Sequence, residues 1–155
     1  MLLAAHLIQT ALYGAYRRPR ELNWYFGLAL LAVELFHDSG HGGFFLAPTG
    51  GEELVARTKG LDDNPIPSGN SMLAHVLLRL GRIWGDDELE RLGVGVLRLV
   101  APALTRAPTA FGWVLCALDL HLSPRRELAI VGPADSPVAR AALGPFQPNS
   151  VVAVG

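Results

Sequence analysis

Residues 57–71 read RTKGLDDNPIPSGNS and separate two helical patterns. The part from Asp62 to Gly69 carries two prolines and a glycine, which predicts an ordered loop and not a helix. Ser68 or Asn70 can cap the helix that follows, because a side-chain oxygen there accepts a hydrogen bond from an unpaired backbone N–H. That helix ends at Gly85, and its apolar face recurs every three to four residues: Leu73, Val76, Leu77, Leu80 and Trp84.

Before this loop, two apolar patterns predict a helical hairpin. One covers residues 3–16, and the other runs from about Arg20 to His37 after Pro19. The second helix has one predicted apolar face, which consists of Leu22, Phe26, Leu30, Val33 and Phe36. The glycine-rich segment from Asp38 to Gly51 cannot continue the helix, and it predicts a small β-hairpin or an extended loop.

After Gly85, two further helices are expected. Acidic residues from Asp86 to Glu88 suit the start of the first, and Pro102 kinks or stops it. Gly93 and Gly95 allow another helix to approach closely. The apolar face of this helix consists of Leu89, Leu92, Val96, Leu99 and Val100. The next helix begins at Pro108, and its inward residues are Phe111, Val114, Leu115 and Leu118.

The C-terminal part follows a different pattern. Leu128 to Val131 and Val151 to Val154 are short strand-like runs. Between them, Ser136 is a helix cap followed by proline at the first helical position, and Val138 to Leu143 is a short helix. The order strand, helix, strand predicts a small parallel βαβ appendage.

Composition limits the class of protein. Half of the residues are hydrophobic and 17% are charged, which is too apolar for a disordered chain. A spanning helix needs about 20 apolar residues. The run from Leu22 to Phe36 is too short and contains Glu34, and the run from Val94 to Leu118 is interrupted by charges and prolines. We therefore expect no membrane span. The first sixteen residues lack a basic start and a cleavage site, so we expect no signal peptide.

Charge and cysteine content exclude other classes. The net charge is -1 and no basic stripe is present, so nucleic acid is not an expected partner. Cys116 is the sole cysteine, which excludes an internal disulfide and agrees with a cytoplasmic protein. His37 and His41 are four residues apart, but the glycines beside them argue against a helical metal site. No metal or cofactor is predicted. His75 lies in an apolar helix and is predicted to be packed, not catalytic.

Three motifs together resemble one known family. Residues 38–45, DSGHGGFF, are similar to a D-x-x-x-GGFF motif. Residues 57–71 resemble an R-x-K-x-x-x-D-x-x-x-PSGNS signature, and residues 111–119 resemble a helix of the same family. That family joins a thioredoxin domain to an N-acylglucosamine 2-epimerase-like barrel, a six-hairpin toroid.

The resemblance implies a mainly α fold. Residues 1–123 would form a partial (α/α) toroid of helical hairpins, like that of six-hairpin glycosidases, and residues 124–155 its βαβ appendage. The thioredoxin domain and the remaining hairpins are absent from this sequence. We therefore expect a fragment of a larger protein of this family.

Inner helix ends and connecting loops line the cavity of such a toroid. Polar side chains on them suit a polyhydroxylated ligand. The predicted substrate-binding residues are Arg57, Lys59, Ser68, Asn70 and Phe45. Asp63 and Asp119 are the predicted catalytic residues, because a carboxyl group can act as an acid or a base.

Structural explanations compete with these roles. An Arg-Lys-Asp cluster on a loop is more often an ion-pair network than a catalytic set. PSGNS is also explained as a cap with a tight turn, and GGFF as a turn that inserts aromatic residues into the core.

Three functions therefore remain open. The first is a carbohydrate-directed epimerase, isomerase or glycosidase-like enzyme that binds a small carbohydrate. The second is a non-catalytic helical module that docks on a thioredoxin-domain chain or self-associates. The third is a truncated product without independent activity.

Overall fold

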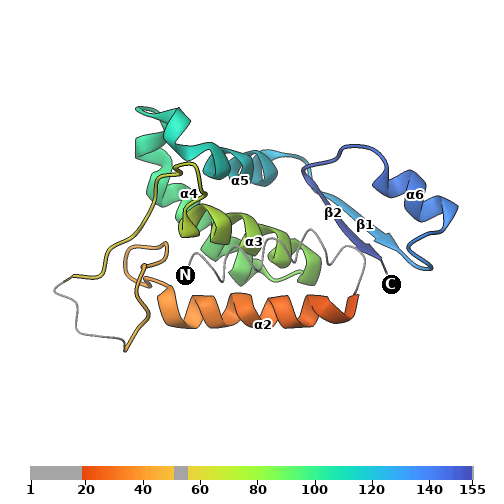
Figure 1. Cartoon of the computed structure of the whole chain (residues 1–155), viewed down its shortest axis with the longest axis horizontal. Helices are drawn as coiled ribbons and strands as arrows, with labels where there is room; N and C mark the ends of the chain where they lie inside the picture. The colour runs from red at the N-terminus through yellow and green to blue at the C-terminus, as the bar shows by residue number, and fades with distance from the viewer. Residues whose placement is uncertain (1–18, 51–55, 155) are drawn as a thin grey trace.

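The computed structural model describes residues 19–50 and 56–154 and is mainly helical (Figure 1). The predicted helix over residues 3–16 and the side chain of Leu22 lie outside this part. The elements in chain order are α2 (Pro19–Phe36), α3 (Gly69–Trp84), α4 (Asp87–Leu104), the 3₁₀ helix η1 (Pro108–Phe111), α5 (Gly112–Leu122), β1 (Arg126–Ile130), α6 (Pro137–Leu143) and β2 (Ser150–Val154). No helix in these two described ranges is long and apolar enough to cross a membrane.

Helix α3 begins and ends where the sequence predicts. The Ser68 side chain accepts a hydrogen bond from the backbone N–H of Ser71, so Ser68 is the N-cap. Gly85 ends the helix in the left-handed conformation, with φ of 65°, which glycine adopts without a Cβ clash. Both boundary predictions are confirmed.

Helix α4 is also capped by its own sequence. The Asp86 side chain accepts hydrogen bonds from the backbone N–H groups of Glu88 and Leu89. Pro102 lies inside the helix, which continues to Leu104. The proline is close to the end of the helix, so the hydrogen bond that it removes belongs to the last turns.

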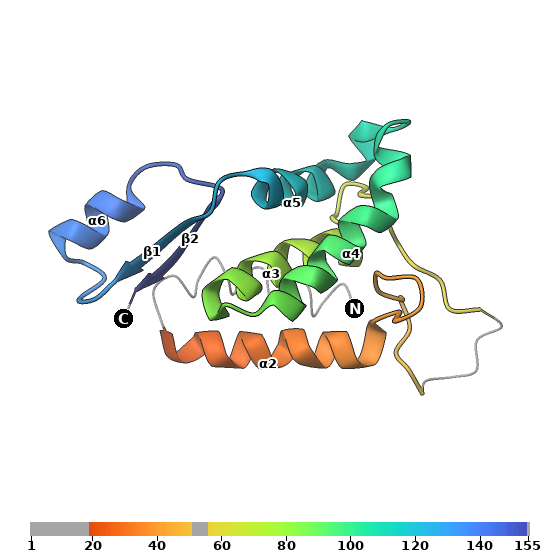
Figure 2. The ribbon, with the colours of Figure 1, turned by 180° about the vertical axis from the view of Figure 1, so that it is seen from behind.

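Helix α3 is the centre of the fold. It contacts α4, α5 and α2, and it is buried along most of its length. Figures 1 and 2 show α2 and α5 on opposite sides of the α3–α4 pair. A Cβ at Gly93 would lie 3.0 Å from Leu78 Cγ, so the predicted close approach is confirmed there. Gly95 has no such neighbour within 4 Å.

The predicted apolar faces of α2 and α5 need correction. Leu30 on α2 is 43% exposed and Leu115 on α5 is 38% exposed, although both were expected to face inward. Cys116 is also exposed. Among the side chains whose burial the structure describes, from Phe26 onward in α2, the buried ones are Ala29 and Ala32 on α2 and Val114, Ala117 and Leu120 on α5. Both helices are apolar around most of their circumference, so periodicity could not select the buried face.

The C-terminal part is the predicted parallel βαβ unit. Strands β1 and β2 pair in parallel, in register from Arg126 opposite Ser150 to Ile130 opposite Val154. Helix α6 contacts β1. A small apolar cluster, apart from the main helical core, fills the space between them and consists of Ile130, Ala139, Val152 and Val154. Val131, predicted to lie in the first strand, follows it and is 94% exposed.

The glycine-rich segment after α2 forms an extended loop with one isolated antiparallel bridge, between His37 and Phe44. Residues 51–55 of the predicted hairpin region lie outside the described residues. Of the two predicted alternatives, a β-hairpin and an extended loop, the structure has the loop, because the described residues here contain a single bridge and no hairpin.

Candidate functional site

Asn70 joins the two family-like motifs. Its side chain is completely buried. The Phe44 N–H donates to Asn70 Oδ1 at 2.7 Å, and Asn70 Nδ2 donates to the carbonyls of Phe44 and Gly60, both at 2.9 Å. Gly43, the residue before Phe44, lies close to the side chain of Leu99: a Cβ at Gly43 would be 2.7 Å from Leu99 Cδ2. Asn70 therefore pairs with the backbone of Phe44 and Gly60 as a neighbouring strand would.

Asp63 connects the starts of two helices. Its Oδ1 accepts hydrogen bonds from the Ser68 N–H at 2.8 Å and from the Ser71 hydroxyl at 2.6 Å, at the start of α3. Its Oδ2 accepts from the N–H groups of Trp113 at 2.8 Å and Val114 at 3.4 Å, at the start of α5. A carboxylate is favourable at a helix N-terminus because the unpaired N–H groups carry partial positive charge.

Lys59 is paired within the chain. Its Nζ lies 2.8 Å from Asp38 Oδ2 and donates to the Gly42 carbonyl at 2.5 Å. The side chains of Lys59 and Asp38 are mostly buried, with 14% and 13% of their surface exposed. The hydrogen bond from Lys59 is the main reason why the pKa of Asp38 lies well below its usual range.

Arg57 and Phe45 also contact each other. The Arg57 guanidinium carbon lies 4.1 Å from the centre of the Phe45 ring, and Lys59 Nζ lies 5.0 Å from it. Arg57 also donates to the carbonyls of Ala47 and Leu35. We call this group of contacts the loop clasp; its residues are Asp38, Phe44, Phe45, Arg57, Lys59, Asp63, Ser68 and Asn70. The clasp contains every predicted site residue except Asp119.

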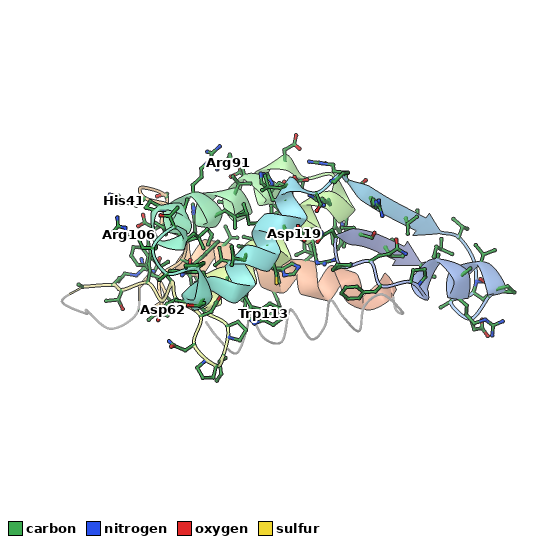
Figure 3. The ribbon with its side chains drawn as sticks, turned by 90° about the horizontal axis from the view of Figure 1, so that it is seen from above. His41, Asp62, Arg91, Arg106, Trp113 and Asp119 are labelled. Carbon is green, nitrogen blue, oxygen red and sulfur yellow. The ribbon has the colours of Figure 1, made fainter. Side chains whose placement is uncertain are left out.

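A pocket lies beside the clasp, between α3, α5 and the segment that joins α6 to β2. Its volume is about 690 Å³. Its polar lining comes from His75 and Arg79 on α3, Asp119 on α5, Gln147 and Asn149 in the joining segment, and Ser150 at the start of β2. Trp113 and Cys116 of α5 contribute the rest of that wall. Figure 3 shows Asp62 and Arg106 at the end of the molecule away from the strands, and Asp119 between that end and the appendage.

Asp119 is exposed and therefore does not need the buried partner that an apolar environment would require. Its Oδ2 accepts a hydrogen bond from Asn149 Nδ2 at 2.7 Å. Asn149 also donates to Ser123 Oγ at 2.8 Å. The two predicted catalytic carboxylates thus lie in different places, Asp63 in the clasp and Asp119 at the pocket.

Sequence reasoning missed His75 and Arg79 as pocket residues. Arg79 Nε donates to His75 Nε2 at 2.9 Å, and Arg79 also donates to the carbonyls of Pro148 and Ser150. Burial, and then the charge of Arg79, lower the pKa of His75 to about 4, so its ring is neutral near pH 7. The available signal was their spacing of four, which places two polar residues on one face of an apolar helix.

The clasp and the pocket share Trp113. Its backbone N–H donates to Asp63, and its side chain lines the pocket. The His75 ring lies 6.5 Å from the Trp113 ring between centroids. Asp63 thereby fixes the start of the helix that forms one wall of the pocket. The described residues contain no group of three His, Cys, Asp or Glu side chains that could hold a metal ion.

Comparison with known proteins gives two kinds of match. Residues 1–48 match the family model described as "Cytochrome b(N-terminal)/b6/petB". This match covers 48 of 155 residues, under a third of the chain, and much of it precedes the described part.

Over most of its length, the chain is similar to spermatogenesis-associated protein 20. The protein of Rattus norvegicus is 31% identical over 122 residues, which are 78% of this chain and 16% of the relative. The protein of Homo sapiens gives the same values, and that of Mus musculus is 30% identical over 122 residues. The chain therefore spans about a sixth of the length of these curated relatives. The homologues of this chain are thus spermatogenesis-associated protein 20 of rat, human and mouse, each matched over a short part of its length.

Proposed function

We propose that this chain is the helical part of an epimerase-like protein and that it binds a small carbohydrate in the pocket between α3, α5 and the appendage. In this proposal, its helices belong to a partial (α/α) toroid of a protein that also carries a thioredoxin domain. The homology to spermatogenesis-associated protein 20 and the family-like motifs support the family. The activity, substrate and localisation of the whole protein are part of the proposal.

The lining of the pocket is the observation that carries this function. A volume of about 690 Å³ lies within the range of about 300–1,000 Å³ that small-molecule sites occupy. Trp113 supplies an aromatic surface and Asp119 an acceptor. Asn149 supplies a second acceptor, its Oδ1, because its NH₂ group already donates to Asp119 and Ser123. A sugar offers the complementary combination of apolar ring faces and hydroxyl groups.

The clasp acts on this pocket through the backbone. Asp63 holds the N-terminal turn of α5, which carries Trp113. The loop that carries Asp63 is held in place by contacts of the other predicted site residues of the clasp, which are Arg57, Lys59, Ser68, Asn70 and Phe45. We assign to Asp119 direct contact with the ligand and to Asp63 the positioning of Trp113. A conversion of the sugar, as an isomerase or glycosidase would catalyse, would use Asp119 as acid or base.

Calorimetric titration of the purified chain with neutral hexoses tests the proposal. We expect saturable binding that is lost in Trp113→Leu. Trp84→Leu is the matched control, because Trp84 stacks on Phe26 with ring centroids 4.8 Å apart and does not line the pocket. Absence of saturable binding by the wild-type chain, or equal binding by Trp113→Leu, would contradict the proposal.

A second candidate function is docking, without catalysis, on a thioredoxin-domain chain or on another copy. Exposed apolar side chains on the appendage favour it: Val131 is 94% exposed, Phe146 92% and Val138 69%. Light scattering after size exclusion measures the molar mass. An oligomer that Val131→Ser converts to a monomer would support docking, because Val131 does not line the pocket. A monomeric wild-type chain would exclude self-association.

A further inference from the structure

The walls of the pocket differ in chemistry. The wall formed by α5 carries Trp113 and Asp119, which the proposed function assigns to the sugar (Figure 3). The wall formed by the end of α6, the joining segment and β2 is rich in apolar residues. We call these residues the apolar wall; they are Ala142, Leu143, Pro145, Phe146, Pro148 and Val152.

Polar side chains beside the apolar wall are paired within the chain. Gln147 Nε2 donates to the Ala142 carbonyl at 3.0 Å, and Gln147 Oε1 accepts from the Ser150 hydroxyl at 3.2 Å. The NH₂ group of Asn149 donates to Asp119 and to one further side chain. This side of the pocket therefore offers a ligand mainly hydrocarbon surface.

Phe146 lies on the apolar wall and is almost fully accessible. It lines the pocket, and 92% of its surface is exposed. Neither of the two apolar clusters that the described residues form contains Phe146, so core packing does not explain an aromatic ring at this position. Small-molecule sites are lined mainly by apolar and aromatic side chains, and Phe146 is a lining residue of this kind.

The pocket is larger than one monosaccharide. A hexose has about twelve non-hydrogen atoms, and at no more than the ~30 Å³ that one water occupies in the liquid it fills at most about 360 Å³. The volume of the pocket is about 690 Å³. A sugar that lies against Trp113 and Asp119 thus leaves close to half of the pocket, on the side of the apolar wall, for a further group.

We propose that the ligand is a sugar that carries an apolar substituent, an aryl or alkyl glycoside, and that Phe146 and its neighbours on the apolar wall bind this substituent. The inference rests on the proposed function, to which it adds the substrate class and a second subsite. Phe146 is the residue that determines specificity for the substituent, whereas Trp113 and Asp119 contact the sugar ring.

The probes are methyl glucoside and phenyl glucoside of the same anomer, titrated by calorimetry. We expect the wild-type chain to bind phenyl glucoside about tenfold more tightly, because the phenyl ring buries apolar surface against the apolar wall. Phe146→Ala should lower the affinity for phenyl glucoside about tenfold and that for methyl glucoside by less than about threefold. In ¹H–¹⁵N spectra, phenyl glucoside should shift the amide signals of Phe146 and Gln147 more than methyl glucoside does.

Val131→Ala is the matched control. Val131 is also on the appendage and is 94% exposed, but it does not line the pocket, so its substitution should change neither affinity. Phe146 and Val131 are both exposed, so neither substitution should unfold the chain, which circular dichroism verifies.

Four other results would count against the inference. Equal affinity of the wild-type chain for the two glucosides would overturn it and leave the sugar site standing. A tenfold preference that survives in Phe146→Ala would overturn the assignment of the substituent to the apolar wall. Phenol titrated alone tests the part of the sugar: if it binds as tightly as phenyl glucoside, the proposed function and this inference fail together. Both also fail if the wild-type chain binds neither glucoside.

Discussion

Asn70 shows how one residue can satisfy the backbone of a distant segment. It pairs with the N–H and carbonyl of Phe44, 26 positions earlier, and with the carbonyl of Gly60. An amide offers donors and an acceptor on one planar group, and aspartate offers acceptors alone. This pairing explains the side chain at position 70 without a ligand.

Asn70→Asp should destabilise the chain strongly. The change keeps the shape but replaces two donated hydrogen bonds by repulsion between the carboxylate and two carbonyl oxygens. We expect a loss of about 2–4 kcal/mol in the free energy of unfolding, measured by urea denaturation. Asn64→Asp is the matched control, since Asn64 is exposed and bonds only to Asp62 among the contacts that the structure describes. Equal stability of the two variants would contradict this account.

His75 should make stability depend on pH. Its pKa in the folded chain is about 4, chiefly because of burial, whereas the ordinary value is 6.5. Between these values the unfolded chain binds more protons, so stability is complete above pH 6.5 and falls as the pH decreases toward 4. We expect a loss on the order of 2 kcal/mol over this window, measured by denaturation at a series of pH values.

His75→Gln should flatten this pH dependence. His41→Gln is the control, because the His41 side chain is 86% exposed. A residual slope is expected, since burial also lowers the pKa of His37. An identical slope in wild type and His75→Gln would show that the folded chain does not hold His75 neutral.

At the scale of the elements, capping residues were predictable and buried faces were predictable in part. Ser68, Asp86 and Ser136 each act as the cap of a helix, and each signal is local in the sequence. The buried faces of α2 and α5 were not predictable, because each of these helices carries apolar residues around most of its circumference. Which side is buried depends on neighbours far away in the chain. The same limit applied to His75, whose pocket is completed by a segment about 70 residues later.

The close packing of α3 against α4 depends on glycine at specific positions. A Cβ at Gly93 would lie 3.0 Å from Leu78 Cγ and 3.1 Å from the Ala74 carbonyl oxygen. At Gly95, in the same helix, a Cβ would meet nothing within 4 Å. The two positions therefore respond differently to the same substitution.

Gly93→Ala should lower stability by about 1–3 kcal/mol, because the helices must separate or shift. Gly95→Ala should raise it by about 0.5–1 kcal/mol, because alanine favours a helix more than glycine does. Thermal unfolding followed by circular dichroism measures both. If both variants gain stability, α3 and α4 do not approach each other as closely as described.

At the scale of the whole molecule, residues 19–50 and 56–154 form two apolar clusters, and polar contacts connect them. The helical core and the cluster of the appendage contain different residues. Strand β2 contacts α3, and Arg79 on α3 donates to the carbonyls of Pro148 and Ser150 at the start of that strand. The sequence predicted both units, but not the arginine that connects them, because its partners are backbone carbonyls, which any residue type carries.

Arg79→Met should loosen the appendage without unfolding the helices. It keeps most of the apolar stem and removes the hydrogen bonds that Arg79 donates to the carbonyls of Pro148 and Ser150. We expect the amide protons of β2 to exchange with solvent about tenfold faster, while those of α3 and α4 change little, measured by hydrogen exchange and NMR. Arg140→Met is the matched control, because Arg140 is exposed on α6. Uniformly faster exchange throughout the chain would mean that the two clusters unfold as one unit. Unchanged exchange in β2 would mean that other contacts, such as those of Asn149 with Asp119 and Ser123, hold the strand in place, and the pocket wall would then not depend on Arg79.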